Sequence, residues 1–160
     1  MAALVDLVAH LPEIEVAPET VVCSDGDRSG AIWVLLSGSL RVMKAGTQVN
    51  RIDRPGAIIG EVAVLLGTGN TATVIAETAC RLRLAEDGAA LLRSEPEIAT
   101  YVAAGLAERL NFVTTYLADL KRQYGAAPGL AMVSEVLSGL ASRQGPPAQP
   151  GSRRDPDPEY

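Results

Sequence analysis

From residue 14 to about residue 84 the chain contains short runs of branched and aliphatic residues, separated by Gly, Pro, Asp and Asn. The runs read AIWVLL, SLRVM, TQVNRI, TATVIA and CRLRLA. Strands of this length, spaced about every ten residues, are typical of a sandwich, roll or barrel of antiparallel strands. The pattern therefore predicts a mainly β fold for this part of the chain.

Most of these runs have one apolar and one polar face. Apolar residues alternate with Arg or Lys in SLRVM and in CRLRLA. Such alternation indicates a sheet with a core on one side and water on the other. Gly38 and Gly46, which lie between runs, are predicted to form hairpin turns. Trp33, the single tryptophan, is predicted to lie in the core.

Helical periodicity is found on both sides of the β region. Residues 2–10 fit a short amphipathic helix that Pro12 ends, and a helical pattern starts again after Asp87. Pro96 stands where a first-turn proline is tolerated, and Gly125 follows two basic residues as a plausible C-terminal cap. A further short helix, LAMVSEVLSGLA, is predicted beyond this cap.

An apolar seam runs along the long helix at alternating spacings of four and three residues, as in a heptad repeat. Its members are Leu106, Leu110, Val113, Leu117, Leu120 and Tyr124. The seam fits a helix that lays one stripe on its own barrel, and it also fits a helix shared with a second copy of the chain. We expect a homodimer, because two and a half strict heptads exceed what one small roll needs. Both contacts can exist on different faces.

The charge of the chain argues against several classes of partner. Its net charge is −5 and its pI about 4.9, whereas a nucleic-acid surface needs a basic stripe for phosphate contacts. The apolar stretches are too short to span a membrane, and the first residues do not have the pattern of a secretory leader. We therefore expect a cytoplasmic protein without nucleic-acid or membrane partners.

Residues that carry catalytic or metal chemistry are sparse. Cys23 and Cys80 lie in apolar runs and are predicted to be reduced core thiols, with a disulfide as the open alternative. His10 is the single histidine, so neither a zinc site nor a Ser-His-Asp arrangement is expected. We predict that the protein is not an enzyme, has no catalytic or metal-binding residues, and uses no cofactor.

The stretch GEVAVLLGTGNTATV, residues 60–74, combines a possible short helix, a loop with two glycines and a strand. Backbone N–H groups at such a turn suit an anion. The loop contains no Lys or Arg to balance that charge. Glu61 and the glycines also have simpler explanations, since a carboxylate suits the first turn of a helix and glycine suits turns.

Four stretches together resemble one known family. They are SDGDRSGAIWVLLSGSLRV (24–42), RPGAIIGEVAVL (54–65), ATVIAETACRLRLA (72–85) and EPEIATYVAAGLAERL (95–110). In this order and spacing, over roughly residues 4–124, the chain resembles the cyclic-nucleotide-binding domains of the catabolite activator protein family, protein kinase regulatory subunits and ion channels. The resemblance implies an antiparallel, jelly-roll-like β-roll of about eight strands, with an N-terminal helix and a long C-terminal dimerisation helix.

The resemblance also implies a phosphate-binding cassette for a cyclic nucleotide, cAMP or cGMP. In the family, a glutamate, here Glu61, accepts a hydrogen bond from the ribose 2′-hydroxyl, and backbone N–H groups of a one-turn helix hold the cyclic phosphate. Thr114 lies on the long helix, where the family usually places base-contacting side chains. The implied ligand-binding residues are Ile59, Gly60, Glu61, Val62, Ala63, Asn70, Thr71, Ala72 and Thr114.

One position departs from the family pattern. Where an arginine would neutralise the phosphate, this chain has Asn70, with Gly69 in place of the usual proline. A neutral amide cannot supply the bidentate, charge-assisted hydrogen bonds of a guanidinium. We expect weakened binding, unless another cation approaches or the ligand is a sugar diol with less phosphate charge. The candidate cations nearest in sequence are Arg28, Arg51 and Arg54.

These features predict a regulatory or sensor module of the cyclic-nucleotide-binding type. The alternative is a ligand-free dimeric interaction scaffold with a degenerate pocket. Residues 1–125 are expected to form the binding domain with its dimer helix, 126–142 a short C-terminal helix, and 143–160 a disordered tail. No helix-turn-helix pattern follows residue 125, so we expect the protein to act on a partner protein in trans or as a stand-alone sensor.

Overall fold

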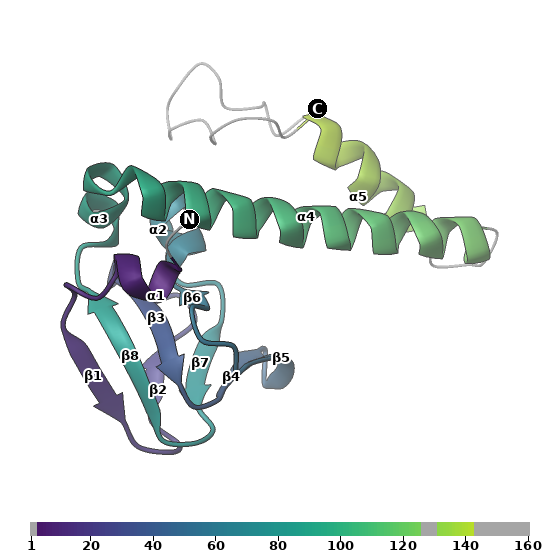
Figure 1. The fold of residues 1–160 in the computed structure, drawn as a ribbon. Coiled ribbons are helices and arrows are strands. Elements are labelled where there is room, and N and C mark those ends of the chain that lie inside the picture. Colours follow the sequence, from purple (N-terminus) through teal and green to yellow (C-terminus); the bar gives the residue numbers. More distant parts are fainter. Residues whose placement is uncertain (1–2, 126–130, 143–160) are drawn as a thin grey trace. The chain divides into compact units, whose positions relative to one another are not determined.

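The structure, a computed structural model, describes residues 3–125 and 131–142 (Figure 1). The chain divides into two compact units, Met1–Ala103 and Ala104–Tyr160. The long helix α4 (Pro96–Tyr124) begins in the first unit and ends in the second. The strands all belong to the first unit, so the predicted cassette lies there as well.

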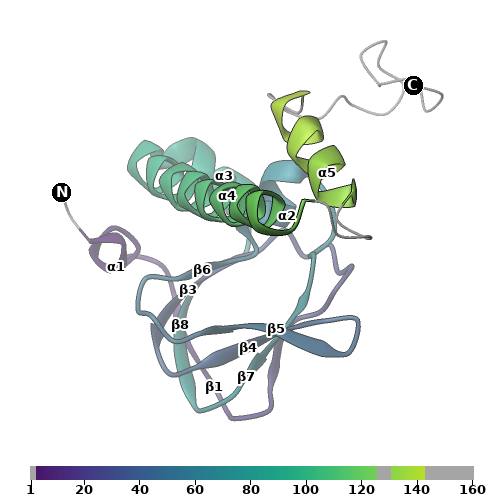
Figure 2. The ribbon, with the colours of Figure 1, turned by 90° about the vertical axis from the view of Figure 1, so that its right-hand side faces the viewer.

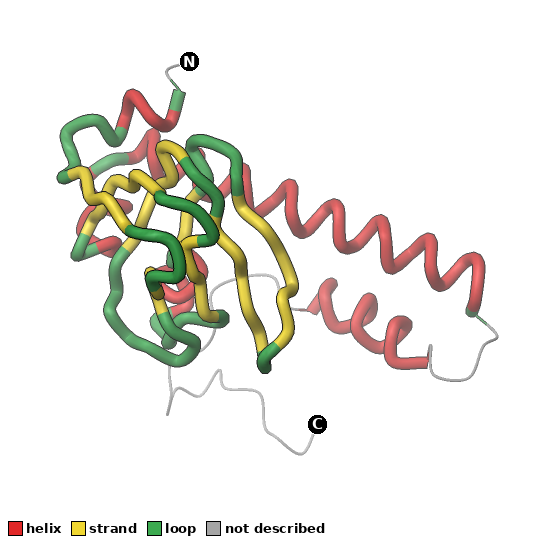
Figure 3. The backbone as a smooth tube through the Cα atoms, turned by 90° about the horizontal axis from the view of Figure 1, so that it is seen from below, coloured by secondary structure: helices red, strands yellow, loops and turns green. Residues whose placement is uncertain are grey.

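Within the described residues, eight strands form two antiparallel sheets (Figure 2), which confirms the predicted β-roll. One sheet has the order β1-β8-β3-β6, and the other has the order β2-β7-β4-β5. Figure 3 marks these strands and the loops that join them. The strands are β1 (Glu13–Val16), β2 (Val21–Cys23), β3 (Ile32–Ser37), β4 (Leu40–Lys44), β5 (Thr47–Ile52), β6 (Ile58–Ile59), β7 (Thr73–Ala76) and β8 (Cys80–Ala85).

The inner faces of the two sheets pack into one apolar core. Leu35 and Leu82 from the first sheet lie in the same cluster as Leu40 and Val74 from the second. Trp33 also belongs to this core, as predicted. In β8, buried apolar residues alternate with more exposed arginines, which is the pattern of a strand with one face toward water.

The turn at Gly38 is not the hairpin that the sequence predicts. Strands β3 and β4 lie in different sheets, so the chain crosses from one sheet to the other at this glycine. A Cβ at Gly38 would lie 2.4 Å from the carbonyl oxygen of Ala79 and 2.6 Å from Sγ of Cys80, so the crossing packs closely against the start of β8. The predicted hairpin at Gly46 is confirmed, because β4 pairs with β5.

Three helices share a second apolar core with β3 and β8. They are α1 (Leu4–Leu7), α3 (Gly88–Ser94) and the first turns of α4. The buried members of this core are Leu4, Val8, Ile32, Val34, Ala85, Leu91 and Ile98. Helix α1 is shorter than the helix predicted over residues 2–10, because the chain leaves the helical conformation at Val8, which is fully buried in this core. Helix α4 begins at Pro96, as expected.

The second unit contains the C-terminal part of α4 and helix α5 (Ala131–Ser142), which agrees with the short helix predicted after residue 125. The predicted apolar seam lies on α4. Within one chain, Leu110, Val113 and Tyr124 of this seam are 53%, 47% and 55% exposed. The tail predicted for residues 143–160 lies outside the described residues, as do residues 126–130.

Candidate ligand-binding site

The cassette begins where β6 meets helix α2 (Glu61–Leu66). Gly60 is the N-cap of α2 and has a left-handed backbone conformation, with φ at +91°. A Cβ on this residue would lie 2.4 Å from the carbonyl oxygen of Ala31 and 3.3 Å from the ring of Trp33. Both the conformation and the lack of space therefore require glycine here. The close approach places the start of α2 directly against the inner core.

The start of α2 combines a buried carboxylate with backbone donors. Ile59, Glu61 and Ala63 are buried, and Val62 is partly buried. The N–H of Val64 donates to the carbonyl of the N-cap residue at 3.2 Å. An α-helix leaves the N–H groups of its first turn without intrahelical acceptors, so those of Val62 and Ala63 are directed beyond the helix start. Residues 59–63 thus form one turn with a carboxylate and donors together.

The loop after α2 is held against the loop that precedes β3. The N–H of Asn70 donates to the carbonyl of Asp27 at 2.8 Å, and the carbonyl of Asn70 accepts from the N–H of Gly26 at 2.7 Å. A Cβ at Gly69 would lie 2.4 Å from the carbonyl oxygen of Gly26. Glycine at position 69 therefore permits this close approach. Position 70 is fixed through its main chain.

The side chain of Asn70 is buried, at 7% exposure, and its Nδ2 has no hydrogen-bond partner. A buried donor without an acceptor costs about 1–3 kcal/mol. Among the described residues, the other buried polar side chains are Ser39 and Glu61. Ser39 is satisfied, since its Oγ donates to Glu77 at 2.7 Å and accepts from Arg51 at 2.9 Å. Glu61 and Asn70 both belong to the cassette.

Lys44, at the end of β4, also contacts the cassette. Its Nζ donates to the carbonyl of Thr71 at 2.6 Å and pairs with Oδ2 of Asp25 at 2.9 Å. The N–H of Asp25 donates to the hydroxyl of Thr73 at 3.0 Å. These hydrogen bonds hold the start of β7 against the loop that precedes β3. Sequence reasoning missed Lys44, because its position beside Thr71 depends on the pairing of β4 with β7, in which Met43 lies opposite Thr73.

The three arginines considered as substitute cations lie in different places. Arg51 on β5 is hydrogen-bonded to Ser39 and Glu77, and the hydrogen bonds from Ser39 and Arg51 hold the pKa of the Glu77 carboxyl below its ordinary value of 4.5. Arg54 is exposed in the turn before β6. Arg28 lines a cleft of about 480 Å³. Of the three, only Arg28 lies beside the loop that follows α2.

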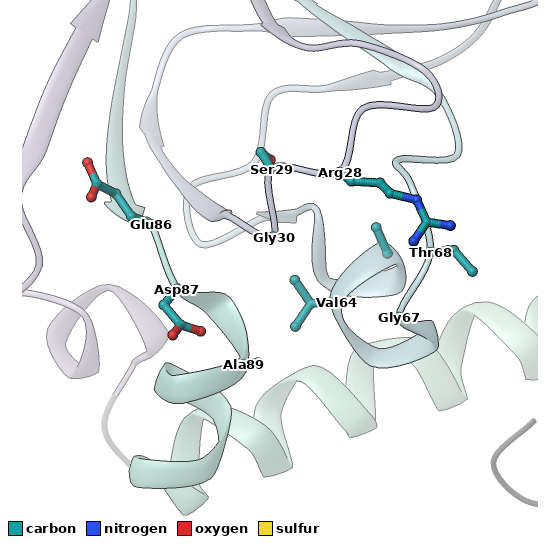
Figure 4. Close-up of a pocket in the computed structure, with 10 residues that line it drawn as sticks. Arg28, Ser29, Gly30, Val64, Gly67, Thr68, Glu86, Asp87 and Ala89 are labelled. Carbon is teal, nitrogen blue, oxygen red and sulfur yellow. The ribbon is translucent and has the colours of Figure 1, made fainter. Parts of the chain in front are cut away.

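The cleft lies between the loop before β3, helix α2 and the start of α3 (Figure 4). Figure 4 shows Arg28 extending toward Thr68, with the carboxylates of Glu86 and Asp87 at the other end of the cleft. The lining does not include the buried carboxylate of α2 or residues 70 and 71. It does include Ala63 and Val64, so Arg28 shares this cleft with helix α2 of the cassette.

Burial and nearby acidic residues of the cassette affect the pKa of the Cys23 thiol, which lies at the end of β2. Burial raises the pKa of Cys23, a hydrogen bond from the backbone of Val74 lowers it, and the negative charges of Asp27 and Glu61 raise it further. Both carboxylates therefore act on the inner end of β2. Cys23 and Cys80 are buried and free, which confirms the predicted reduced thiols.

The remaining predicted site residues fall into two groups. Thr71 is exposed and Ala72 partly buried, and both lie in the chain segment that leads from position 70 into β7. Thr114 lies on the part of α4 that belongs to the second unit, so its contact with a ligand stays a prediction.

In the part of the chain that the structure describes, no set of three or more His, Cys, Asp or Glu side chains is arranged to hold a metal ion. No helix in this part combines the length and the apolar character needed to cross a membrane.

The comparisons with known proteins agree with this geometry. The model of the cyclic nucleotide-binding domain family matches residues 13–91. The Catabolite Activator Protein of Thermus thermophilus is 25% identical, with a TM-score of 0.57, and the match covers 91% of this chain and 88% of that one. A transcriptional regulator of Thermotoga maritima is 19% identical, with a TM-score of 0.61, over 76% of this chain and 99% of that one.

A third solved structure, PKAR CBD2 with Sp-2Cl-cAMPS bound, is 19% identical, with a TM-score of 0.52, over 67% of this chain and 75% of that one. Four longer solved chains match over 27% to 37% of their own length. Among curated proteins, no sequence matches this chain. The matched segment contains all eight strands and the complete cassette. Through residues 13–91, the chain belongs to the cyclic nucleotide-binding domain family.

Proposed function

We propose that the protein is a regulatory or sensor module whose cassette binds a cyclic nucleotide, cAMP or cGMP, with lowered affinity. The observation that carries this proposal is the pair of buried polar side chains, Glu61 and Asn70, that the cassette contributes. The carboxylate of Glu61 suits a ribose hydroxyl, and the N–H groups of Val62 and Ala63 suit phosphate oxygens. Nδ2 of Asn70 is a hydrogen-bond donor without an acceptor, and a bound ligand would supply one.

The expected affinity follows from the exchange of a cation for an amide at position 70. A hydrogen bond to a charged group contributes about 1.5–3 kcal/mol, against about 1 kcal/mol for a neutral one. Leaving a half-buried phosphate without its cation costs about 2–5 kcal/mol. At about 1.4 kcal/mol per factor of ten, the affinity falls by roughly 30- to 3,000-fold. A site of micromolar affinity would become a site of roughly millimolar affinity.

Calorimetric titration of the full chain with cAMP and cGMP tests this proposal. We expect dissociation constants near the millimolar range for the wild type and tighter binding by about 30-fold or more for Asn70→Arg. Thermal unfolding gives a second readout, because a ligand at a hundred times its dissociation constant stabilises the fold by about 2.7 kcal/mol.

Asn50→Arg is the matched control, because it adds the same charge at an exposed asparagine on β5. It is expected to leave the affinity for both nucleotides unchanged. Submicromolar binding of cAMP or cGMP by the wild type would contradict the role assigned to Asn70. An equal gain in affinity from Asn50→Arg would show that the effect is one of overall charge.

The same proposal includes a homodimer formed through the seam of α4 and a protein partner that receives the signal. Exposure of Leu110, Val113 and Tyr124 in the single chain supports the dimer. A ligand-free dimeric scaffold is the second candidate. It is favoured by the bonds from Asp27 and Lys44, which hold the cassette without a ligand. Retained dimerisation with no binding of any nucleotide would select this second candidate.

A further inference from the structure

The loop before β3 places a basic side chain beside the cassette. The carbonyl of Asp27 accepts from the N–H of Asn70 at 2.8 Å, so this loop and the loop after α2 lie against each other. Arg28 is the next residue of the chain, and it lines one cleft together with Ala63 and Val64 of α2. Position 70 itself has no cation, but the residue bonded to it is followed directly by one.

Arg28 differs from the basic residues on the strands of the roll, because it has no counter-ion. The strand residues that pair with carboxylates are Arg41, Lys44, Arg51, Arg81 and Arg83. None of the residues that the structure describes forms an ion pair or a side-chain hydrogen bond with Arg28, which extends toward Thr68 (Figure 4). Its guanidinium therefore keeps its full set of donors for an anion.

The two ends of the cleft carry opposite charges. Its volume of about 480 Å³ is typical of a site for a small molecule. Glu86 and Asp87 lie at the end away from Arg28 (Figure 4), and Asp87 also caps α3. Like charges repel, so an anion in this cleft is bound at the Arg28 end. Ser29, the next residue of the lining, adds a hydroxyl donor there.

We infer that Arg28 supplies the cation for the phosphate of a bound nucleotide, in place of the arginine that position 70 lacks. The inference rests on the proposed function, from which it takes a cyclic nucleotide bound by the cassette. Ala63 belongs both to α2 and to the lining of the cleft, so the cassette and the cleft meet at this residue. Arg28 is exposed, so water and salt screen its charge, and it replaces only part of what a buried arginine would supply.

NMR titration of the isotopically labelled full chain with cAMP and cGMP tests the inference, since this method measures dissociation constants in the millimolar range. Arg28→Gln removes the charge and keeps a polar side chain. It is expected to weaken binding of the better nucleotide about 3- to 30-fold, because a charge-assisted hydrogen bond becomes a neutral one.

Arg54→Gln is the matched control, because it removes the same charge from an exposed arginine that does not line the cleft. It is expected to leave the affinity unchanged. Equal losses in Arg28→Gln and Arg54→Gln would show that the effect is one of overall charge and would overturn the inference.

Two further ligands separate the phosphate from the rest of the nucleotide. The nucleoside of the better nucleotide has no charge, so its affinity is expected to be the same for the wild type and for Arg28→Gln. Inorganic phosphate is expected to bind more weakly than the nucleotide, because it makes none of the contacts of the sugar and the base. Phosphate binding as tight as nucleotide binding, or a loss of nucleoside affinity equal to that of the nucleotide, would contradict the assignment of Arg28.

A double-mutant cycle with position 70 gives a second, independent test. If Arg28 and an arginine at position 70 contact the same phosphate, their effects on affinity are not additive. The loss caused by Arg28→Gln is therefore expected to shrink below about threefold when Asn70→Arg is also present. A loss of the same size in both backgrounds would overturn the inference.

The possible outcomes separate this inference from the proposed function. Nucleotide binding by the wild type that Arg28→Gln leaves unchanged overturns the inference and leaves the proposed function standing. Absence of binding of both cAMP and cGMP by the wild type overturns the proposed function and the inference with it. If Asn70→Arg does not fold, the comparison of Arg28→Gln with Arg54→Gln decides the matter.

Discussion

Gly60 meets two demands at the point where the roll turns into the cassette. Its φ of +91° belongs to a region that residues with a Cβ rarely adopt, and its hydrogen atoms face the carbonyl oxygen of Ala31. The first demand concerns the backbone of one residue, and the second concerns its packing against a segment almost thirty residues earlier. The backbone strain and the steric clash that a Cβ would cause at position 60 are independent, so removing one would leave the other.

Gly60→Ala is therefore expected to lower the free energy of unfolding by about 2 kcal/mol or more, since it adds backbone strain to a clash. Urea unfolding of the two proteins measures this difference. Gly105→Ala is the control, because Gly105 lies inside α4 with nothing within 4 Å of a Cβ. That change should raise stability by about 0.5–1 kcal/mol. Equal stabilities for wild type and Gly60→Ala would contradict the packing described here.

Residues of the cassette differ in how far the sequence predicts their surroundings. Gly60 and Glu61 are predictable, because the turn and the first helical turn are set by neighbouring residues. The burial of Asn70 is not, because it depends on the loop at Gly26 and Asp27, more than forty residues away. The contact of Lys44 with Thr71 is equally non-local. The local sequence pattern therefore predicts the surroundings of Glu61, but it does not predict the contacts around Asn70.

Helix α3 is a short element whose start depends on one side chain. Oδ1 of Asp87 accepts a hydrogen bond from the N–H of Ala90 at 2.8 Å, which satisfies one donor of the first turn. Asp87→Ala should lower the free energy of unfolding by about 1 kcal/mol, as measured by urea unfolding. Glu86→Ala, at the exposed neighbour, should change it by less than about 0.5 kcal/mol. A larger effect at Glu86 would rule out the cap as the cause.

At the level of elements, the longer strands follow from the sequence and the shorter ones do not. Thr47–Ile52 and Cys80–Ala85 form strands with the bounds of the runs TQVNRI and CRLRLA. Strands β1, β2 and β6 have only four, three and two residues, which is too few to show a period. They exist because partners are in place, such as Trp33 opposite Ile59. The change of sheet at Gly38 is likewise decided by pairing between distant segments.

For the whole molecule, the proposal of a homodimer rests on apolar surface that one chain leaves exposed. Leu110 and Tyr124 are each more than half exposed on α4, although both belong to the heptad seam. Burial of a side chain of this size contributes about 1.5–3 kcal/mol per residue, so a second copy of the seam would gain from covering them. The sequence indicates the seam, but it does not indicate what packs against it, because the same periodicity fits a contact within one chain and a contact between two chains.

Leu110→Glu is expected to convert the dimer to monomer, because it would place a charge within the apolar seam. Light scattering of the wild type and the variant measures the mass. Asn111→Glu, at the exposed neighbour off the seam, should leave the mass of the dimer unchanged. A monomeric wild type, or a Leu110→Glu variant of unchanged mass, would refute the proposed dimer.

The two main-chain hydrogen bonds at Asn70 bear on how such a site evolves. Because they use only backbone atoms, they constrain the identity of residue 70 little beyond excluding proline, which has no N–H to donate to Asp27. A substitution at position 70 can therefore leave both bonds to Gly26 and Asp27 in place. What such a change costs the fold is then set by whether the new side chain fits the buried space that the amide now fills.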